Sequence, residues 1–201
     1  MTGLSTMEFD LLAQGYRSVA GVDEAGRGPL AGPVVAAAVI FTPNIRLEGI
    51  GDSKALSATR REELSSQIRE HAAAWGIGRA SPEEIDELNI LQASILAMHR
   101  AIGALNPASD YLLVDGNRFH HPDLPFTTVV KGDARCFSIG AASILAKVDR
   151  DRIMKELHER YPEYDFAKHK GYPTASHIDA LRRHGPCPIH RRSFHVRSLD
   201  E

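Results

Sequence analysis

Short runs of aliphatic residues recur along the chain, and Gly, Pro, Asp or Ser residues separate them from their neighbours. Runs of this length that are rich in Val, Ile, Leu or Ala predict strands of a buried sheet. Five segments fit the pattern: residues 18–23, 34–41, 75–80, 111–115 and 127–131.

Segments with apolar residues three or four positions apart predict helices between and after these strands. They are residues 57–74, 82–105 with a break near Asn89, 139–161, and 175–184 with Thr174 as the cap. The second helix has a strong start, because Ser81 precedes a proline and Glu84 follows three residues after the cap. Thr59 and Glu62 have the same spacing near the start of the first helix.

The order of these elements predicts a mixed α/β domain with a helical C-terminal part. We expect a lead-in segment at residues 1–17, the α/β domain at 18–165 and a small helical extension at 166–201. A chain of 201 residues and 22.0 kDa needs only one main core. Hydrophobic residues at 43% and charged residues at 25% exclude a disordered or fibrous protein.

The two cysteines, Cys136 and Cys187, lack the spacing of a redox or zinc motif and are too few for a disulfide framework. Cys136 is expected to be a buried apolar thiol. The first residues do not have the pattern of a secretory signal, and no apolar run is long enough to span a bilayer. We therefore expect a cytoplasmic protein that does not associate with membranes.

The formal net charge of −2 argues against a protein that coats nucleic acid indiscriminately, but the charge is unevenly distributed. Residues 168–197 contain seven Lys or Arg and one acid, Asp179. A basic C-terminal region joined to an acidic body suits an enzyme that binds phosphates with one part and cations with another. A solvated basic helix without a ligand is the alternative.

Carboxylates follow three of the predicted strands. Asp23 and Glu24 end the first strand, Asp115 ends the fourth, and Asp133 follows the fifth. Functional groups gather where the strands of an α/β sheet end, so these acids can meet in the fold. An ordinary turn at Asp115 is the alternative, but the adjacent pair Asp23-Glu24 repels itself unless it is exposed, separated or neutralised by a cation. Carboxylate oxygens suit Mg²⁺ or Mn²⁺ and not zinc, and four of them can hold the two ions used for displacement at phosphorus.

The loop after Glu24, which we call the glycine loop, contains Gly26, Arg27 and Gly28. Its spacing and the strand that follows do not fit a dinucleotide-binding fold, and the chain has no P-loop. Glycines allow a sugar to approach the backbone closely, and an arginine between them can hold a phosphate. A plain tight turn is the alternative.

Seven motifs occur in order between about residue 18 and residue 196. They are Gly21-Val-Asp-Glu-Ala-Gly-Arg-Gly-Pro-Leu-Ala-Gly-Pro-Val34, Asp52-Ser-Lys54, Val114-Asp-Gly116, Lys131-Gly-Asp133, Ala141-Ala-Ser-Ile-Leu-Ala-Lys147, His169-Lys-Gly-Tyr-Pro-Thr174 and His190-Arg-Arg-Ser-Phe194. Together they closely resemble ribonuclease HII, the bacterial type 2 ribonuclease H. The length of the first motif makes chance a poor explanation.

The resemblance implies a ribonuclease H-like fold, with a mixed central sheet flanked by helices and a small C-terminal helical extension that binds substrate. It assigns catalysis and metal binding to the four acids Asp23, Glu24, Asp115 and Asp133. It also matches Tyr172 to the family's substrate-sensing tyrosine, which reads the 2′-hydroxyl at an RNA-to-DNA junction together with the glycine loop.

The implied activity is hydrolysis of the RNA strand of RNA/DNA hybrids and cutting at ribonucleotides embedded in duplex DNA. Two divalent ions, Mn²⁺ or Mg²⁺, serve this reaction, and attack by water on the 5′ side of the ribonucleotide leaves 3′-hydroxyl and 5′-phosphate ends. Two alternatives stay open, namely another ribonuclease H-like DNA nuclease, such as a junction resolvase, and a non-catalytic hybrid-binding module.

Lys54, Ser143 and Lys147 are candidates for contacts with substrate phosphates, with solvated lysines as the alternative. Surface or phosphate-side positions are expected for the ten histidines, and Trp75 is expected in the core. We expect a monomer whose partners are RNA/DNA hybrid and ribonucleotide-containing duplex DNA. No stable protein partner is expected, because no clamp-binding peptide follows Val196.

Overall fold

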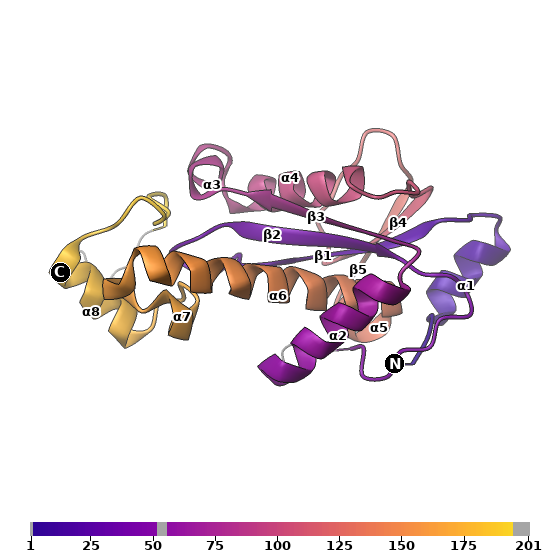
Figure 1. The fold of residues 1–201 in the computed structure, drawn as a ribbon. Coiled ribbons are helices and arrows are strands. Elements are labelled where there is room, and N and C mark those ends of the chain that lie inside the picture. The colour runs from indigo at the N-terminus through magenta and orange to yellow at the C-terminus, as the bar shows by residue number, and fades with distance from the viewer. Residues whose placement is uncertain (1, 52–55, 195–201) are drawn as a thin grey trace.

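The computed structural model describes residues 2–51 and 56–194 of the chain. Its five-stranded sheet has the order β3-β2-β1-β4-β5, with β1 antiparallel to β2, β2 antiparallel to β3, and β4 parallel to both β1 and β5. Helices lie on both faces of this mixed sheet (Figure 1). The predicted mixed α/β fold is confirmed.

The strands lie close to the predicted segments. They are β1 (Val19–Ala25), β2 (Val34–Ile40), β3 (Ala74–Ala80), β4 (Tyr111–Asp115) and β5 (Phe126–Val129). The fifth strand ends two residues earlier than predicted, before Lys131. That residue has a left-handed backbone conformation, φ 56°, and precedes the short helix α5 (Gly132–Arg135).

Two consecutive helices cover one face of the sheet. They are α3 (Pro82–Leu88) and α4 (Ile90–Gly103). The predicted start is confirmed, because the Ser81 side chain accepts the N–H of Glu84 and the Glu84 side chain accepts the N–H of Ser81. The predicted break is also confirmed at Asn89, which has φ 71° and whose side chain accepts two backbone N–H groups in the first turn of α4.

Two helices from distant parts of the chain cover the other face. They are α2 (Ala58–His71) and α6 (Phe137–Arg160). Two details predicted for α2 are wrong. Ser57 and not Thr59 caps the helix, by accepting the N–H of Arg60, and the helix stops short of Ala74, which already belongs to β3.

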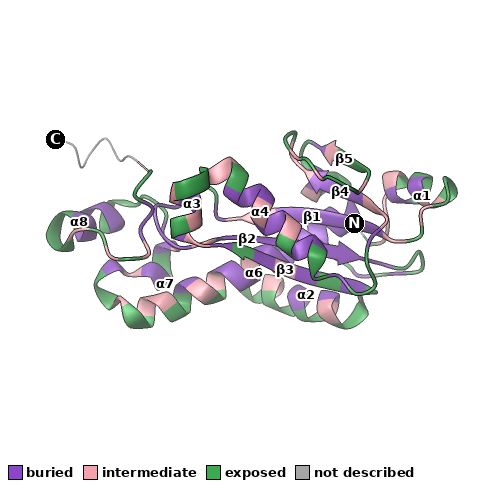
Figure 2. Ribbon diagram, turned by 90° about the horizontal axis from the view of Figure 1, so that it is seen from above, coloured by how far each residue is buried: buried purple, intermediate pink, exposed green. Residues whose placement is uncertain are grey.

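The centre of the sheet is fully enclosed between these layers. Figure 2 shows the buried strands between the helices, and every residue of β2 is buried. The contact between β1 and α6 is especially close, because a Cβ at Gly21 would lie 2.2 Å from the backbone of Ser138. Only glycine fits there, so α6 can place its side chains directly beside the end of β1.

An N-terminal helix, α1 (Thr6–Ala13), precedes the sheet, although the hydrophobic pattern predicts no helix before residue 18. Its Glu8 is buried and accepts the backbone N–H groups of Phe137 (3.3 Å) and Ser138 (2.8 Å), the first residues of α6. A carboxylate at this position satisfies free donors and interacts favourably with the helix dipole. The α1 helix therefore fixes the start of α6.

The chain beyond α6 folds into a small helical extension, at the far end of α6 in Figure 1. It consists of η1 (Pro162–Tyr164), α7 (Phe166–His169) and α8 (Ala175–His184). Thr174 caps α8 as predicted, by accepting the N–H of His177. The core of the extension contains Leu30, Ala31, Met154, Tyr164, Phe166, Ile178, Ala180 and Leu181. Two of these residues come from the connection between β1 and β2, so the extension packs against the segment that follows the glycine loop.

Trp75 is not in the core, so that prediction is wrong. Its side chain is 38% exposed on the α2 side of β3, where the Arg69 guanidinium lies 4.2 Å from the centre of its ring. This is the geometry of a cation–π contact. Cys136 is completely buried, as predicted. None of the helices in the described ranges is both long and apolar enough to cross a lipid bilayer.

Candidate active site

Sheet topology brings the four predicted acids to one cleft. Asp23 and Glu24 lie at the end of β1, and Asp115 ends β4. Because β1 and β4 are parallel neighbours, Asp23 and Asp115 lie at the same edge of the sheet. Asp133 lies in α5, directly after β5, and lines the same cleft.

Asp23 is 6% exposed, and its carboxylate accepts hydrogen bonds from the Ser143 hydroxyl and from the backbone N–H of Glu24 (2.7 Å). Burial raises the pKa of Asp23 well above the ordinary 3.8, and the negative charges of Glu24 and Asp115 raise it further. The two hydrogen bonds offset only part of this effect. The ionised carboxylate therefore needs a positive partner.

Glu24 has one oxygen paired and one unpaired. Its Oε1 lies 3.2 Å from Nη1 of Arg27, whereas Oε2 is buried and has no hydrogen-bond partner among the described residues. Burial raises the pKa of Glu24, and Arg27 lowers it in part. A buried carboxylate oxygen without a partner costs free energy unless a cation or a donor occupies the adjoining space.

Asp115 is fixed by the backbone at the start of α5. Its Oδ1 accepts the N–H of Gly132 at 2.6 Å. A Cβ at Gly132 would lie 2.7 Å from Cδ1 of Ile139 and 3.2 Å from Oδ1 of Asp115, so glycine permits this approach. Burial raises the pKa of Asp115, the Gly132 hydrogen bond lowers it in part, and the charge of Asp133 raises it.

The acids fit a hard divalent cation, although no three His, Cys, Asp or Glu side chains in residues 2–51 and 56–194 are already grouped as a metal site. Each acid instead has a nearby donor, which is a backbone N–H for Asp23, Asp115 and Asp133 and a guanidinium for Glu24. Such spreading is expected of like charges without a counter-charge. Carboxylate oxygens, raised pKa values and one unpaired buried oxygen together suit Mg²⁺ or Mn²⁺ better than zinc.

The cleft that holds these acids has a volume of about 430 Å³. Its lining also includes the glycine loop, Lys131, Ser143, Lys147, Arg150 and Tyr172. Every site residue predicted from the sequence that lies in the described ranges is therefore in this one cleft. Lys54 lies outside the described residues.

The glycine loop and Tyr172 are close neighbours in the cleft. A Cβ at Gly28 would lie only 3.6 Å from Cε1 of Tyr172. Gly26 has φ +100°, and a Cβ there would lie 2.1 Å from Nε of Arg150, so the turn requires glycine. The side chains of Arg27 and Tyr172 are 52% and 43% exposed, and both are accessible to a ligand.

Two buried arginines, for which the sequence predicts no role, bind the backbone of the segment from Gly26 to Pro33. Arg191 donates to the carbonyls of Gly26 (2.6 Å), Arg27 (3.1 Å) and Gly32 (3.0 Å), and Arg150 donates to those of Ala31 (3.2 Å) and Pro33 (3.0 Å). Burial lowers the pKa of Arg191 to about 9 and that of Arg150 to about 10, so both stay positive at neutral pH. Their partners are more than 100 residues away in sequence, and no local pattern indicates such contacts.

Three histidines for which a surface position was predicted are buried instead. His169, His177 and His190 are at most 8% exposed and lie in the extension, in ring contact with Phe166. The surface prediction is wrong for these three, because protein groups satisfy their ring nitrogens.

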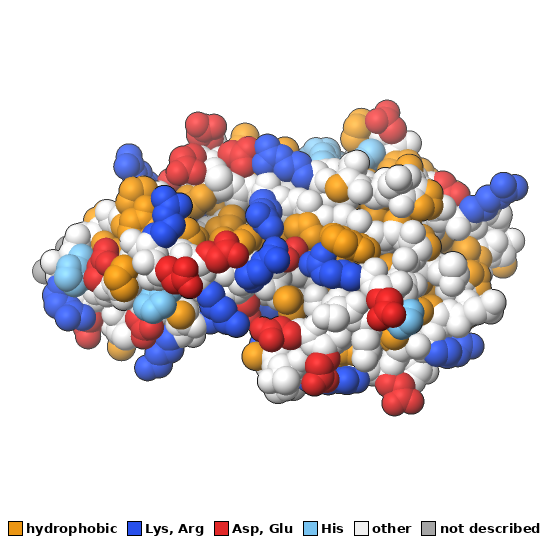
Figure 3. All heavy atoms as spheres, in the orientation of Figure 1, with side chains coloured by type: hydrophobic (Ala, Val, Ile, Leu, Met, Phe, Trp, Pro, Cys, Tyr) orange, Lys and Arg blue, Asp and Glu red, His pale blue; other side chains and the backbone are white. Residues whose placement is uncertain are grey.

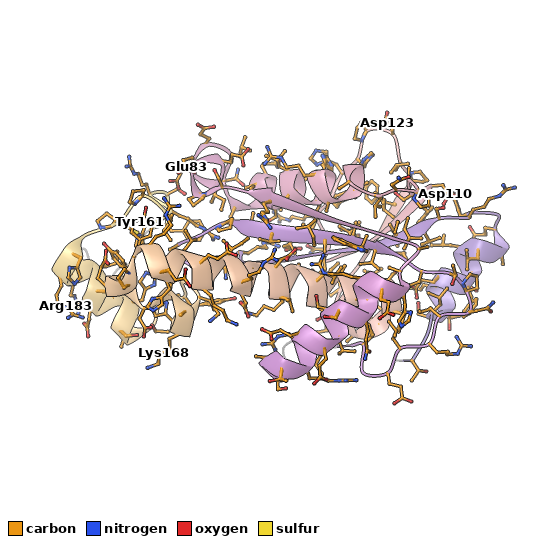
Figure 4. The ribbon with its side chains drawn as sticks, viewed as in Figure 1. Glu83, Asp110, Asp123, Tyr161, Lys168 and Arg183 are labelled. Atoms are coloured by element: carbon orange, nitrogen blue, oxygen red, sulfur yellow. The ribbon has the colours of Figure 1, made fainter. Side chains whose placement is uncertain are left out.

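Exposed basic side chains lie near the cleft and on the extension. A groove of about 270 Å³ contains Lys147, Lys155, Lys168 and Lys170 and adjoins the cleft through Lys147. Figure 3 shows basic side chains along α6, interspersed with acids. Lys168 and Arg183, labelled in Figure 4, point outward from the α7 and α8 end of the molecule. This distribution matches the basic C-terminal region seen in the sequence.

Comparison with known proteins gives matches over nearly the whole chain. A family model described as Ribonuclease HII matches residues 20–197. A ribonuclease HII from Pelodictyon phaeoclathratiforme is 55% identical over 189 residues, which cover 91% of this chain and 92% of that protein. The ribonuclease H2 from Pyrococcus horikoshii OT3 superposes with a TM-score of 0.74 at 28% identity, covering 92% of this chain and 97% of that one. The structure of a PCNA:RNase HII complex from Archaeoglobus fulgidus gives a TM-score of 0.68 at 26% identity, with coverage of 90% and 96%.

Proposed function

The chain belongs to the ribonuclease HII family and is an endoribonuclease, and we propose that it cuts both the RNA strand of RNA/DNA hybrids and single ribonucleotides embedded in duplex DNA. The proposed reaction is hydrolysis on the 5′ side of the ribonucleotide, with 3′-hydroxyl and 5′-phosphate ends. The monomeric state, the cytoplasmic location and the absence of a stable protein partner stay predictions.

The observation that carries this proposal is the meeting of four carboxylates and a tyrosine in one cleft. A turn carboxylate would lie at the surface with its oxygens in water, whereas Asp23 is buried and the side chain of Glu24 beside it is only 9% exposed. A protein keeps such repelling groups together at a cost in stability, which is typical of a functional site.

Asp23, Glu24, Asp115 and Asp133 would hold two divalent cations, Mg²⁺ or Mn²⁺. Bound cations of this kind stabilise the negative charge that develops on phosphate oxygens during hydrolysis. The unpaired Oε2 of Glu24 and the raised pKa of Asp23 support this assignment, because a cation would satisfy the first and offset the cause of the second.

The glycine loop and Tyr172 would recognise the ribose. The 2′-hydroxyl is the group that separates RNA from DNA. Gly28 presents backbone without a Cβ, and the Tyr172 ring beside it can pack on the sugar while its hydroxyl forms a hydrogen bond. The buried guanidinium of Arg191 supports this role, because it fixes the carbonyls of Gly26 and Arg27.

Ser143 and Lys147 on α6 would contact substrate phosphates, together with Arg27. Ser143 already donates to Asp23, so it also fixes the position of a catalytic acid. Lys147 lines both the cleft and the adjoining groove that contains Lys168, and it pairs with Asp151. The phosphate contact of Lys54 stays a prediction from the sequence, because this residue lies outside the described ranges.

The test is to incubate the purified chain with three duplexes of one sequence, in Mg²⁺, in Mn²⁺ and in a chelator. One duplex has a single ribonucleotide in DNA, one is an RNA/DNA hybrid and one is all DNA. We expect cuts in the first two only, dependent on a divalent ion, with 5′-phosphate ends. Comparable cutting of the all-DNA duplex would favour a DNA nuclease, binding without cutting would favour a hybrid-binding module, and a cyclic phosphate product would exclude water as the nucleophile.

A further inference from the structure

A chain of hydrogen bonds runs through the extension and ends on the backbone of Tyr172. Its members are Cys187, His190 and His177. The backbone N–H of Cys187 lies 3.0 Å from Nδ1 of His190, Nε2 of His190 lies 3.0 Å from Nε2 of His177, and Nδ1 of His177 lies 2.9 Å from the carbonyl oxygen of Tyr172. His177 is 0% exposed and His190 is 6% exposed, so water does not compete for these bonds.

The direction of each bond follows from its two ends. The N–H of Cys187 can only donate, so Nδ1 of His190 accepts and its proton is on Nε2. That Nε2–H donates to His177, whose own proton is therefore on Nδ1. The His177 Nδ1–H then donates to the Tyr172 carbonyl, which can only accept. One arrangement of neutral imidazoles satisfies the whole chain.

A second proton on His177 does not fit this arrangement, because it would place two N–H groups against each other between His177 and His190. A second proton on His190 would oppose the N–H of Cys187, and its acceptor would be the Cys187 carbonyl oxygen, 3.3 Å from Nδ1. Burial is the main reason that the pKa of His177 is lowered and that of His190 is lowered to about 4. Both rings are therefore neutral at neutral pH. The hydrogen-bond chain is fixed in one direction under the conditions in which the protein acts.

The same row of hydrogen bonds links Tyr172 to the segment between β1 and β2 that contains the glycine loop. The backbone of His190 forms a β-bridge with Ala31, and the next residue, Arg191, donates to the carbonyls of Gly26 and Arg27. Tyr172 is held by its own backbone as well, since its N–H donates to His169 and its carbonyl accepts the N–H of Thr174. The backbone also joins this turn directly to the opposite side of the cleft, because the N–H of Leu30 donates to the carbonyl of Gly171 at 2.8 Å. The His177 bond adds a side-chain contact on the carbonyl of Tyr172 itself.

We propose that His177 and His190 are positioning residues that hold Tyr172 at a fixed distance from Gly28, so that the ring and the loop meet the same ribose. Neither histidine lines the cleft, and both act through the Tyr172 carbonyl. The inference rests on the proposed role of Tyr172 in sensing the ribonucleotide.

The test uses two substitutions of His177, one that keeps its hydrogen bond to Tyr172 and one that keeps its hydrogen bond to His190. In His177→Asn the amide nitrogen lies near the position of Nδ1 and can still donate to Tyr172. In His177→Gln the amide reaches the position of Nε2, so the contact with His190 is kept and the bond to Tyr172 is lost. We expect His177→Gln to lower kcat/KM on a single-ribonucleotide duplex about tenfold and His177→Asn to stay within about threefold of the parent. His71→Ala, at the exposed end of α2, is the control and is expected to have no effect.

A double-mutant cycle with Tyr172→Ala separates positioning from general support of the fold. Tyr172→Ala alone is expected to lower the rate, and adding His177→Gln to it is expected to cost no further activity. An equal loss in both backgrounds, or equal effects of Asn and Gln, would overturn the positioning role. A parental rate for Tyr172→Ala would instead overturn the proposed sensor, and the inference with it. Melting temperatures of all variants, measured alongside, show whether a loss follows unfolding.

Discussion

Asp23 shows at the scale of one residue how the acid cluster opposes the folding of the metal-free chain. Its pKa is raised from 3.8 by burial and then by its acidic neighbours. A carboxyl group whose pKa is higher in the folded than in the unfolded state makes the protein less stable as the pH rises between the two values. The penalty is complete above the raised pKa and absent below about 4, where both states are protonated.

Asp23→Asn is therefore expected to stabilise the metal-free protein at neutral pH, and the role proposed for Asp23 predicts that the same variant is inactive. The amide keeps the size of the side chain and removes the buried charge. The melting temperature is expected to rise by a few degrees, since about 1 kcal/mol of stability changes the melting temperature of a chain of this size by about 2–4 °C. Scanning calorimetry in a chelator measures this change, with the exposed Asp10→Asn as control. An unchanged or lower melting temperature would show that the charge carries no penalty.

Single residues differ in how far the sequence predicts them. Asp23 and Asp115 could be predicted, since strand ends and carboxylates are both local patterns. The roles of Arg150 and Arg191 could not, because an arginine is normally solvated and these two bind carbonyls far away in sequence. The burial of His177 could not be predicted either, because its partner His190 lies in a later segment of the sequence.

Glu8 joins two helices that are far apart in the sequence, α1 and the first turn of α6. Glu8→Ala is expected to lower the free energy of unfolding by about 1–3 kcal/mol, since it leaves buried N–H groups of α6 without an acceptor. Urea denaturation measures this loss. Asp10→Ala, on the exposed side of the same helix, is the control and should change stability little. Equal stability of the two variants would mean that α1 does not support α6.

The elements themselves were largely predictable, with instructive exceptions. The break at Asn89 has a local cause, because its side chain caps α4. The α1 helix has a local signal too, because Ser5 and Glu8 form a capping box in which Glu8 accepts the N–H of Ser5 at 2.6 Å. The hydrophobic pattern does not detect this signal, and the contact of Glu8 with α6 depends on a distant segment. The early end of β5 depends on the left-handed Lys131, a conformation that propensity does not predict for lysine.

At the scale of the whole molecule, the α/β domain supplies the acids and the extension supplies Tyr172. The two parts share α6 and the connection after the glycine loop, because Met154, Leu30 and Ala31 belong to the core of the extension. The cleft therefore lies where both parts are fixed to each other. Sequence patterns predict each part, but their relative placement depends on buried long-range contacts such as those of Arg191.

Exposed basic residues of the extension give a prediction for duplex binding. The affinity for a duplex, measured in a chelator, should fall steeply as the salt concentration rises. In the double variant Lys168→Ala/Arg183→Ala, the slope of log affinity against log salt concentration should be smaller in magnitude by about 1–2. Fluorescence anisotropy at several salt concentrations measures the slope. Arg17→Ala should leave the slope unchanged, because the backbone of Arg17 bonds to Asp110, which lies far from Arg183 in Figure 4. Equal slopes for the double variant and the parent would place the phosphate contacts elsewhere.

Asp115→Asn, measured for both cutting and binding of a duplex with one ribonucleotide, tests directly whether the four acids form one active site. Asp115 reaches the cleft from β4, so its loss tests whether acids from separate strands act together. We expect the rate of cleavage in Mg²⁺ or Mn²⁺ to fall by about 100-fold or more, with duplex affinity within about twofold of the parent. A variant that keeps most of the parental cleavage rate would contradict the account.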